Sequence, residues 1–319
     1  MLATKPKLIV ILGPTASGKT GLALKLAKIF NGEIISADSR QIYKEMDIGT
    51  AKPLQNKKSN IKNKNDRLKI KIIENVPHHL IGIIKPNQRF NVALYKKLAL
   101  KAIKNIHQRG KLPFLVGGTG LYIQAIVDNF DYPKIKPDWK LRKKLGVKTA
   151  KHLFSLYKKL DPEGAKKIDK NNKRRLIRAI EVCRLAKSPF WQQRQKKEPL
   201  FDVLQIGIKL SENQLKKNIA RRTKKMFKAG LEKETKKLFK KYGKKLPALQ
   251  TIGYEEFKDY KGEKRIIKDY KGVAERIKKH TFQYAKRQMT WFKNDSRIRW
   301  VKDYNEAKVV IKRFTEDSM

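Results

Sequence analysis

The sequence has few of the features that mark a secreted or membrane-bound protein. Its 319 residues include one cysteine, Cys183, which excludes an intramolecular disulfide framework and a cysteine-based metal cluster. The apolar run near the amino terminus extends only from Leu8 to Leu12, which is too short for a signal peptide or a membrane span. We therefore expect a cytoplasmic protein without a membrane-spanning segment.

Negative charge is also scarce. Asp and Glu together number 29 against 78 Lys and Arg, which gives a formal net charge of +49. Such an excess indicates a polyanionic partner, above all a nucleic acid, although AT-rich codon usage also raises the lysine count. Hydrophobic residues make up 40% of the chain, as in folded globular proteins rather than disordered ones.

The spacing of apolar residues predicts an α/β fold. Strands at 8–12, 33–36 and 112–116 are expected to alternate with helices at 20–30 and from Asn91 to about 110. This alternation is typical of a parallel sheet flanked by helices, as in P-loop NTPases.

The pattern changes twice, which predicts an inserted domain. After residues 1–127, the first part of the core, only helices are expected over 128–200, including 151–160 and 171–186. A strand at 202–210 resumes the core, whose second part, 201–319, ends in helices from Ser211 and from Gly272 and a short strand at 297–301. The Lys/Asn-rich stretch 54–72 is interpreted as a flexible surface insertion.

The strongest motif is GPTASGKT, which joins the first predicted strand to the first predicted helix. Its glycines let backbone N–H groups surround a phosphate, and the helix amino terminus adds positive potential. The phosphate-binding residues predicted for this P-loop are Gly13, Pro14, Thr15, Ala16, Ser17, Gly18, Lys19 and Thr20. The Thr20 hydroxyl is placed to ligate Mg²⁺, the one cofactor expected. The motif suits ATP or a prenyl diphosphate, because both present similar oxygens.

A nucleotide-hydrolysing P-loop enzyme should carry a second carboxylate that holds the Mg²⁺ shell. The strand LPFLV runs instead into GGTG at 117–120, and the acid found at a strand end is Asp38. This pattern argues against a kinase or NTPase, although small P-loop kinases also place an aspartate there. An RNA-binding protein that has lost its chemistry is disfavoured because Lys19, Thr20 and Asp38 are all present.

Further blocks follow the P-loop in order. The nine blocks are GPTASGKT (13–20), ISADSRQIYKEMDIGTAKP (35–53), PHHLIG (77–82), FNVALY (90–95), LVGGTGLYI (115–123), LDPEGAKKI (160–168), RRLIRAIEV (174–182), QTIGYEE (250–256) and QYAKRQMTWF (283–292). Together they resemble the tRNA dimethylallyltransferases of bacterial type, except over 54–75 and the last residues.

The resemblance implies Mg²⁺-dependent transfer of a dimethylallyl group from dimethylallyl diphosphate to N6 of the adenosine 3′-adjacent to the anticodon. It also implies an inserted helical domain that grips the anticodon arm of tRNA. We expect a monomer.

The chemistry needs a carboxylate near the adenine amine, a weak nucleophile, and cations around the diphosphate leaving group. By the resemblance, Asp38 is the general base and Thr119 lines the channel where donor and base meet. Arg222 matches an arginine that reaches the diphosphate. Alternative roles are a turn cap or a second contact to Mg²⁺ for Asp38, and a helix N-cap for Thr119.

The resemblance also implies tRNA contacts. The residues concerned are Asp38, Ser39, Arg40, Gln41, Arg142, Arg174, Arg175, Leu176, Ile177, Arg178, Gln250, Thr251, Gly253, Lys286, Arg287 and Gln288. Within 283–292, basic residues alternate with aromatic ones, which suits phosphate neutralisation and base stacking, or equally an amphipathic helix with an aromatic core face. The target base must leave its stack to enter the pocket.

Four further positions stand apart from the predicted site residues. His78 and His79 could suggest a metal site, but no third ligand has suitable spacing, so a structural role is predicted. Gly82 and Phe282 replace the Asp and Arg of many family members. These two departures affect the expected donor or tRNA affinity, not the expected chemistry.

Overall fold

The computed structural model describes residues 5–53, 70–133, 135–193, 196–259 and 266–316. The chain separates into two compact units. One combines Met1–Val127 with Leu200–Met319, and the other is Asp128–Pro199. The predicted insertion, 128–200, and the observed second unit differ by one residue at one end.

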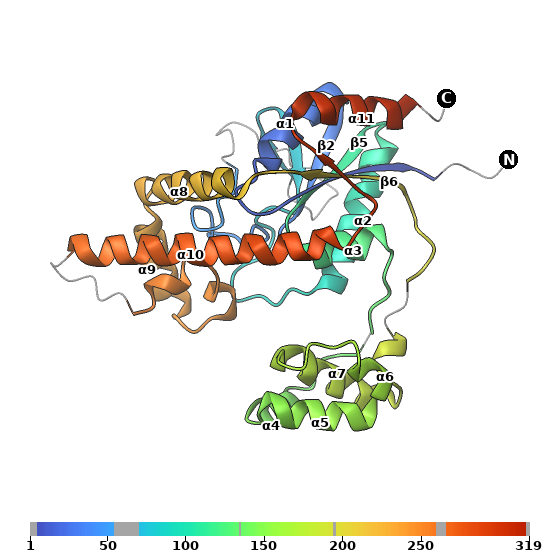
Figure 1. The fold of residues 1–319 in the computed structure, drawn as a ribbon, viewed down its shortest axis with the longest axis vertical. Helices are drawn as coiled ribbons and strands as arrows, with labels where there is room; N and C mark the ends of the chain where they lie inside the picture. The colour runs from blue at the N-terminus through green and yellow to red at the C-terminus, as the bar shows by residue number, and fades with distance from the viewer. Residues whose placement is uncertain (1–4, 54–69, 134, 194–195, 260–265, 317–319) are drawn as a thin grey trace. The chain divides into compact units, whose positions relative to one another are not determined.

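The first unit contains a seven-stranded sheet of order β3-β4-β2-β5-β1-β6-β7 (Figure 1). The strands are β1 (Lys7–Leu12), β2 (Gly32–Ala37), β3 (Lys71–Ile73), β4 (Val76–His79), β5 (Leu112–Gly117), β6 (Asp202–Ile208) and β7 (Ile298–Val301). Every neighbouring pair is parallel except β3 and β4. The predicted fold class, a P-loop-type parallel sheet flanked by helices, is confirmed.

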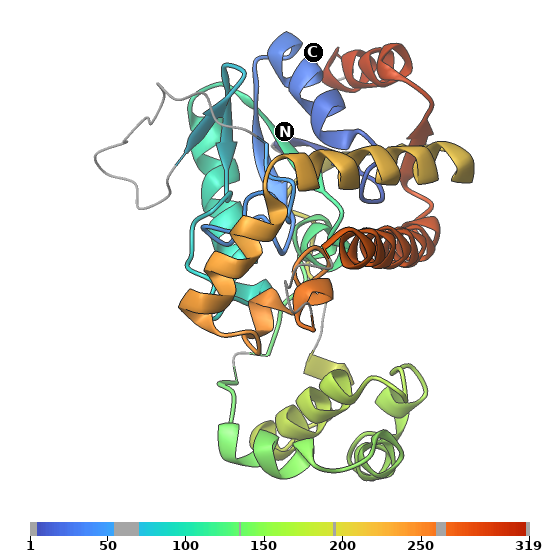
Figure 2. The same cartoon turned by 90° about the vertical axis from the view of Figure 1, so that its left-hand side faces the viewer.

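Helices cover both faces of the sheet (Figures 1 and 2). The helices α1 (Lys19–Ile29) and α11 (Tyr304–Glu316) pack against one face, and α2 (Val92–Gln108) and α3 (Gly120–Val127) against the other. On the second face the rings of Tyr95 and Tyr122 stack with centroids 3.9 Å apart. Because successive β1 residues point to opposite faces, the apolar run from Leu8 to Leu12 is buried on both sides.

Three further helices complete this unit: α8 (Glu212–Lys228), α9 (Leu231–Tyr242) and α10 (Ile266–Lys293), with short 3₁₀ turns η2 (Pro247–Leu249) and η3 (Glu255–Phe257). They share a hydrophobic cluster with the loop after β2, through Met46. Helices α9 and α11 were not predicted from the sequence, and α10 begins six residues before its predicted start at Gly272. Gly230, with φ +93°, separates α8 from α9.

One predicted feature needs correction. The interpreted surface insertion 54–72 falls mostly on residues 54–69, outside the described part of the chain. Its end, however, is strand β3, in which Ile72 and Ile73 are buried. The sequence KIKII has the apolar content of an edge strand, which the surrounding lysines mask.

The second unit is helical, as predicted. It contains α4 (Trp139–Gly146), α5 (Ala150–Leu160), α6 (Pro162–Ala165), α7 (Lys173–Ala186) and the 3₁₀ turn η1 (Trp191–Gln193). Side chains that accept a backbone N–H at the helix starts are Asp138, Thr149, Asp161 and Asn172. Such caps satisfy N–H groups that have no partner within the helix.

Over the described residues, none of the helices has the length and apolar content needed to cross a membrane.

Candidate active site

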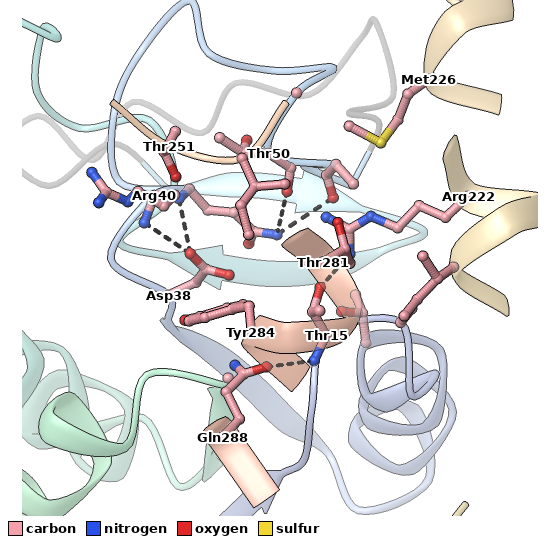
Figure 3. Close-up of a pocket in the computed structure, with 18 of the residues that line it drawn as sticks. Thr15, Asp38, Arg40, Thr50, Arg222, Met226, Thr251, Thr281, Tyr284 and Gln288 are labelled. Carbon is pink, nitrogen blue, oxygen red and sulfur yellow. Dashed lines mark hydrogen bonds between the residues drawn. The ribbon is translucent and has the colours of Figure 1, made fainter. Parts of the chain in front are cut away.

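A cavity of about 520 Å³ opens at the carboxyl ends of β1, β2 and β5. Its lining combines the P-loop, the loop after β2, residues 250–252 and one face each of α8 and α10 (Figure 3). Carboxyl ends of neighbouring parallel strands meet at one edge, where α/β proteins bind ligands.

The P-loop turns into the cavity through unusual backbone angles. Ala16 and Gly18 have positive φ, at +63° and +87°. Gly18 precedes α1 and offers no side-chain cap, so the first N–H groups of α1 are open to an anion. The predicted residues Thr15, Ala16, Gly18, Lys19 and Thr20 all line the cavity.

The remaining P-loop residues play a different part. Gly13, Pro14 and Ser17 do not line the cavity. Ser17 is buried, and its hydroxyl has no hydrogen-bond partner among the described residues. These three residues shape the loop behind its cavity-lining members, and their predicted contact with phosphate stays a prediction.

Two of the cationic side chains that line the cavity lie at the P-loop. Lys19 Nζ donates to the Pro14 carbonyl at 3.0 Å, and Arg222 Nη1 of α8 donates to Thr15 Oγ1 at 2.9 Å. Burial lowers the pKa of Lys19 to about 8; the charge of Asp38 opposes this, and that of Arg222 adds to it. Burial also lowers the pKa of Arg222. Both cations would gain from a phosphate ligand, because an anion would replace the water they have lost.

Asp38 follows β2 and lines the same cavity. Its Oδ1 accepts the backbone N–H of Arg40 at 2.8 Å and of Gln41 at 3.2 Å (Figure 3). Within the described part of the chain, its Oδ2 accepts no hydrogen bond. One oxygen therefore caps the turn, as the alternative role required, and the other is left for a substrate proton.

Thr119 supports the Asp38 turn from behind. Its Oγ1 accepts the Ser39 N–H at 3.0 Å, and its own N–H donates to the Ala37 carbonyl at 3.1 Å. Gly117 makes this approach possible, since a Cβ there would lie 2.1 Å from the Ala37 oxygen. Thr119 is not itself among the residues lining the cavity, but its hydroxyl also pairs with Tyr284, which does line it, so its predicted place beside the channel stays a prediction.

Gln288 was predicted to contact tRNA, but both ends of its buried amide bind the protein. Oε1 accepts the Thr15 N–H at 2.8 Å, and Nε2 donates to the Gly118 carbonyl at 2.7 Å. The side chain thus joins α10 to the P-loop and to the loop after β5. Gln288 also lines the cavity, so its predicted contact with tRNA stays a prediction.

Other predicted tRNA residues of this unit differ in position. Those that line the cavity are Ser39, Arg40, Gln41, Gln250, Thr251 and Arg287. Lys286 is exposed, with Nζ 4.6 Å from the centre of the Phe282 ring. Gly253 has φ +98° and donates its N–H to Glu256 at 2.8 Å, which indicates a backbone role.

In the second unit, two of the predicted arginines bind a carboxylate instead. Arg142 Nη2 and Arg178 Nη1 contact the fully buried Glu181 at 2.7 and 2.5 Å. Burial by itself would raise the pKa of Glu181. The hydrogen bonds from both arginines outweigh this effect, so the pKa lies below its ordinary value. Arg142 and Arg178 therefore have a structural role in this unit, and their predicted contact with tRNA stays a prediction.

The other predicted residues of α7 divide by exposure. Leu176 is fully buried in the core of the unit, so the prediction that its side chain contacts tRNA is wrong. Ile177 is half-buried and packs against that core, and its predicted contact stays a prediction. Arg174 and Arg175 are exposed, and their role as tRNA contacts stays a prediction.

The less polar part of the cavity was not predicted from the sequence. The unpredicted lining residues include Ile219, Thr223, Met226, Ile252, Ile277, Thr281 and Tyr284. On α8 and α10 these positions recur every three or four residues, which is the spacing of one helix face. On α8, where Arg222 marks the face, this periodicity could have identified Ile219, Thr223 and Met226. Burial, with the charge of Asp38, raises the pKa of Tyr284 to about 12.

No cluster of three Asp, Glu, His or Cys side chains suited to a metal occurs within the described ranges. A Mg²⁺ ion at the P-loop would therefore rest on the Thr20 hydroxyl, which lines the cavity, and on ligand oxygens and water. His79 Nε2 lies 2.8 Å from the buried Glu33, and His78 Nδ1 lies 2.9 Å from the Val76 carbonyl. Burial lowers the pKa of His78 to about 4.

The fold and the cavity define a P-loop protein that can hold an anion beside a carboxylate. The chain belongs to the IPP transferase family, whose model matches residues 41–295. A tRNA dimethylallyltransferase of Carboxydothermus hydrogenoformans is 39% identical over 97% of this chain and 95% of its own. The membership confirms the predicted resemblance and the enzyme class, a prenyltransferase.

Solved structures agree. A tRNA isopentenylpyrophosphate transferase of Bacillus halodurans matches with a TM-score of 0.67 and 36% identity, over 98% of this chain and 96% of its own. A eukaryotic dimethylallyltransferase described as acting on tRNA matches with a TM-score of 0.78 and 26% identity, over 98% of this chain and 80% of its own.

Proposed function

We propose that the protein transfers a dimethylallyl group from dimethylallyl diphosphate to N6 of the adenosine 3′-adjacent to the anticodon in tRNA. One observation carries the proposal: a single cavity holds both a carboxylate and a site suited to a diphosphate. Lys19, Arg222 and the uncapped start of α1 lie at the end of β1, and Asp38 lies at the end of β2, which β5 separates from β1 in the sheet. Less polar side chains of α8 and α10 complete the lining and suit a short hydrocarbon group.

The proposed step forms a bond between N6 and C1 of the dimethylallyl group and breaks the bond from C1 to the diphosphate oxygen. Lys19, Arg222 and the first N–H groups of α1 neutralise the charge that develops on the departing diphosphate. Asp38 Oδ2 accepts the proton that N6 loses. Bound Mg²⁺, held through Thr20, would add positive charge at the same oxygens.

Recognition of tRNA in this proposal uses both units. Arg40, Gln250 and Arg287 line the cavity and would meet the extruded adenosine and its neighbours. Arg174 and Arg175 of the helical unit would neutralise phosphates of the anticodon arm. We further propose that the enzyme acts in the cytoplasm as a monomer.

The test is transfer of label from radioactive dimethylallyl diphosphate to unmodified tRNA with Mg²⁺, in the wild type and in Asp38→Asn. Loss of the base should reduce the rate by ~10²–10⁴-fold, while the exposed Asp259→Asn should not change it. Transfer that survives in Asp38→Asn would reject the base assignment but keep the reaction. Absence of transfer by the wild type, together with turnover of ATP, would favour a kinase.

A further inference from the structure

Glu234 of α9 binds the loop after β2 through its backbone. The carboxylate accepts the N–H groups of three successive residues: Asp47 at 3.1 Å, Ile48 at 2.9 Å and Gly49 at 3.0 Å. Consecutive N–H groups that converge in this way form an anion-binding nest. In this protein the nest holds a carboxylate of the protein itself.

The same carboxylate also reaches the other loop of the cavity wall. The Tyr254 hydroxyl donates to Glu234 Oε1 at 2.7 Å. Gly49 lies directly against the Tyr254 ring, where a Cβ would come within 2.3 Å, and a Cβ on Gly253 would lie 2.9 Å from the Gly49 oxygen. Glu234 therefore joins two chain segments that touch each other.

These two segments form part of the cavity lining. Gly49, Thr50 and Ala51 line it from the first, and Gln250, Thr251 and Ile252 from the second. In Figure 3, Arg40, Thr50 and Thr251 lie above Asp38 in the view, and Thr15 and Gln288 lie below it. We refer to residues 47–51 and 250–254 together as the loop wall.

Asp38 is connected to the loop wall through Gln41. The Gln41 N–H donates to Asp38 Oδ1 at 3.2 Å, and its Nε2 lies 3.5 Å from the Thr50 oxygen and 3.4 Å from the Ala51 oxygen. A shift of the loop wall would therefore change the support of the turn that orients Asp38. A displacement of about 1 Å in such a constellation can cost ~10²-fold in rate.

A second set of contacts shows that α9 carries the loop as a whole. Glu45 accepts from Lys241 Nζ at 2.7 Å and from the Tyr242 hydroxyl at 2.8 Å. Both donors lie near the end of α9, whereas Glu234 lies in its first turn. Helix α9 thus binds the loop after β2 at two separate places, through Glu234 and through Lys241 and Tyr242.

We propose that Glu234 is a positioning residue for prenyl transfer: its carboxylate fixes the loop wall and so holds the substrate against Asp38, while the P-loop side of the cavity does not depend on it. The inference rests on the proposed function for its effect on turnover. Its structural part, the dependence of the loop wall on the carboxylate, stands without that function.

The experiment compares Glu234→Gln with Glu275→Gln, an exposed glutamate of α10 that pairs with Lys278. The amide keeps the size of the side chain but loses its charge and turns one acceptor into a donor toward N–H groups. We expect kcat for prenyl transfer to fall at least ~10-fold, and hydrogen exchange at Asp47, Ile48 and Gly49 to accelerate at least ~10-fold. Exchange in β1 and β5 and the Kd for inorganic diphosphate should stay within about twofold.

Tyr254→Phe removes one hydrogen bond to Glu234 and should reproduce the same pattern more weakly. It serves as the second variant if Glu234→Gln does not fold. Wild-type kcat and wild-type exchange in Glu234→Gln would overturn the proposal. A parallel loss of diphosphate binding and of sheet protection would overturn it too, because it would show general unfolding. If the wild type transfers no prenyl group, the proposed function fails, whereas the exchange and diphosphate measurements still decide the role of Glu234.

Discussion

The P-loop side of the cavity and the loop wall (residues 47–51 and 250–254) hold their shape by different means. The P-loop is a contiguous segment whose conformation depends on its own glycines and on the start of α1. The loop wall consists of two segments about 200 residues apart in the chain, joined by the Glu234 carboxylate of a third. The loop that surrounds the phosphate, with Lys19, is therefore local in sequence, and Arg222 of α8 is the distant cation that binds it, whereas the loop wall depends on distant residues throughout.

The largest effect should come from the local side. Lys19→Met removes the charge that faces the diphosphate, and hydrogen bonds to charged groups are worth about 1.5–3 kcal/mol. We expect the Kd for dimethylallyl diphosphate at pH 7 to rise about 100-fold. Lys25→Met, on the exposed face of the same helix, should leave it unchanged. Calorimetric titration measures both values, and equal effects in the two variants would contradict the assignment.

The pH dependence sharpens this prediction. Because the pKa of Lys19 is about 8, protonated lysine falls from most molecules at pH 7 to a minority at pH 9. The affinity advantage of the wild type over Lys19→Met should shrink about tenfold over that range.

The contribution of Lys19 to folding stability changes with pH in the opposite direction to its contribution to affinity. Folding lowers this pKa from 10.5, so the unfolded state binds more protons between about pH 8 and 10.5, and the free energy of unfolding gains with rising pH there.

The second largest effect should come from Gln288, the residue of α10 that binds the P-loop from a distant part of the sequence. Gln288→Ala removes the two hydrogen bonds that tie α10 to Thr15 and Gly118. At about 0.5–1.5 kcal/mol each, their loss should lower kcat/KM for the donor about 20-fold. The exposed Gln283→Ala on the same helix is the control. If Gln288 instead served mainly as a tRNA contact, KM for tRNA would rise and donor binding would stay unchanged.

Contiguous motifs carried most of what the sequence could predict. The P-loop, the Asp38 turn and the helical insertion each show in a short stretch of residues, through glycine spacing or a change of periodicity. The roles of Gln288 and Glu234 could not be predicted, since their partners lie 273 and 185 residues away. No local pattern reports a hydrogen bond at that separation.

The helical unit gives an intermediate case. Arg178 lies three residues before Glu181, a spacing that brings side chains together on a helix, so their pairing was open to prediction. Arg142, the second arginine bound to Glu181, is 39 residues away in the sequence, so that contact was not open to prediction. The block RRLIRAIEV therefore mixes exposed arginines with a structural one, and the resemblance by itself assigned all three to tRNA.

The smallest expected effect concerns these arginines. Arg174→Gln or Arg175→Gln should weaken tRNA binding about threefold at moderate salt and reduce the slope of log Kd against log salt by about one, because each would release one phosphate contact. Unfolding temperature and donor Kd should not change.

Arg142→Gln should behave in the opposite way. It leaves the buried Glu181 with a single arginine, so the unfolding temperature should fall while the salt slope stays the same. A salt slope that responds to Arg142 and not to Arg174 or Arg175 would reverse the assignment. It would place the tRNA on the face of the unit where Glu181 lies, even though the side chains there are already paired.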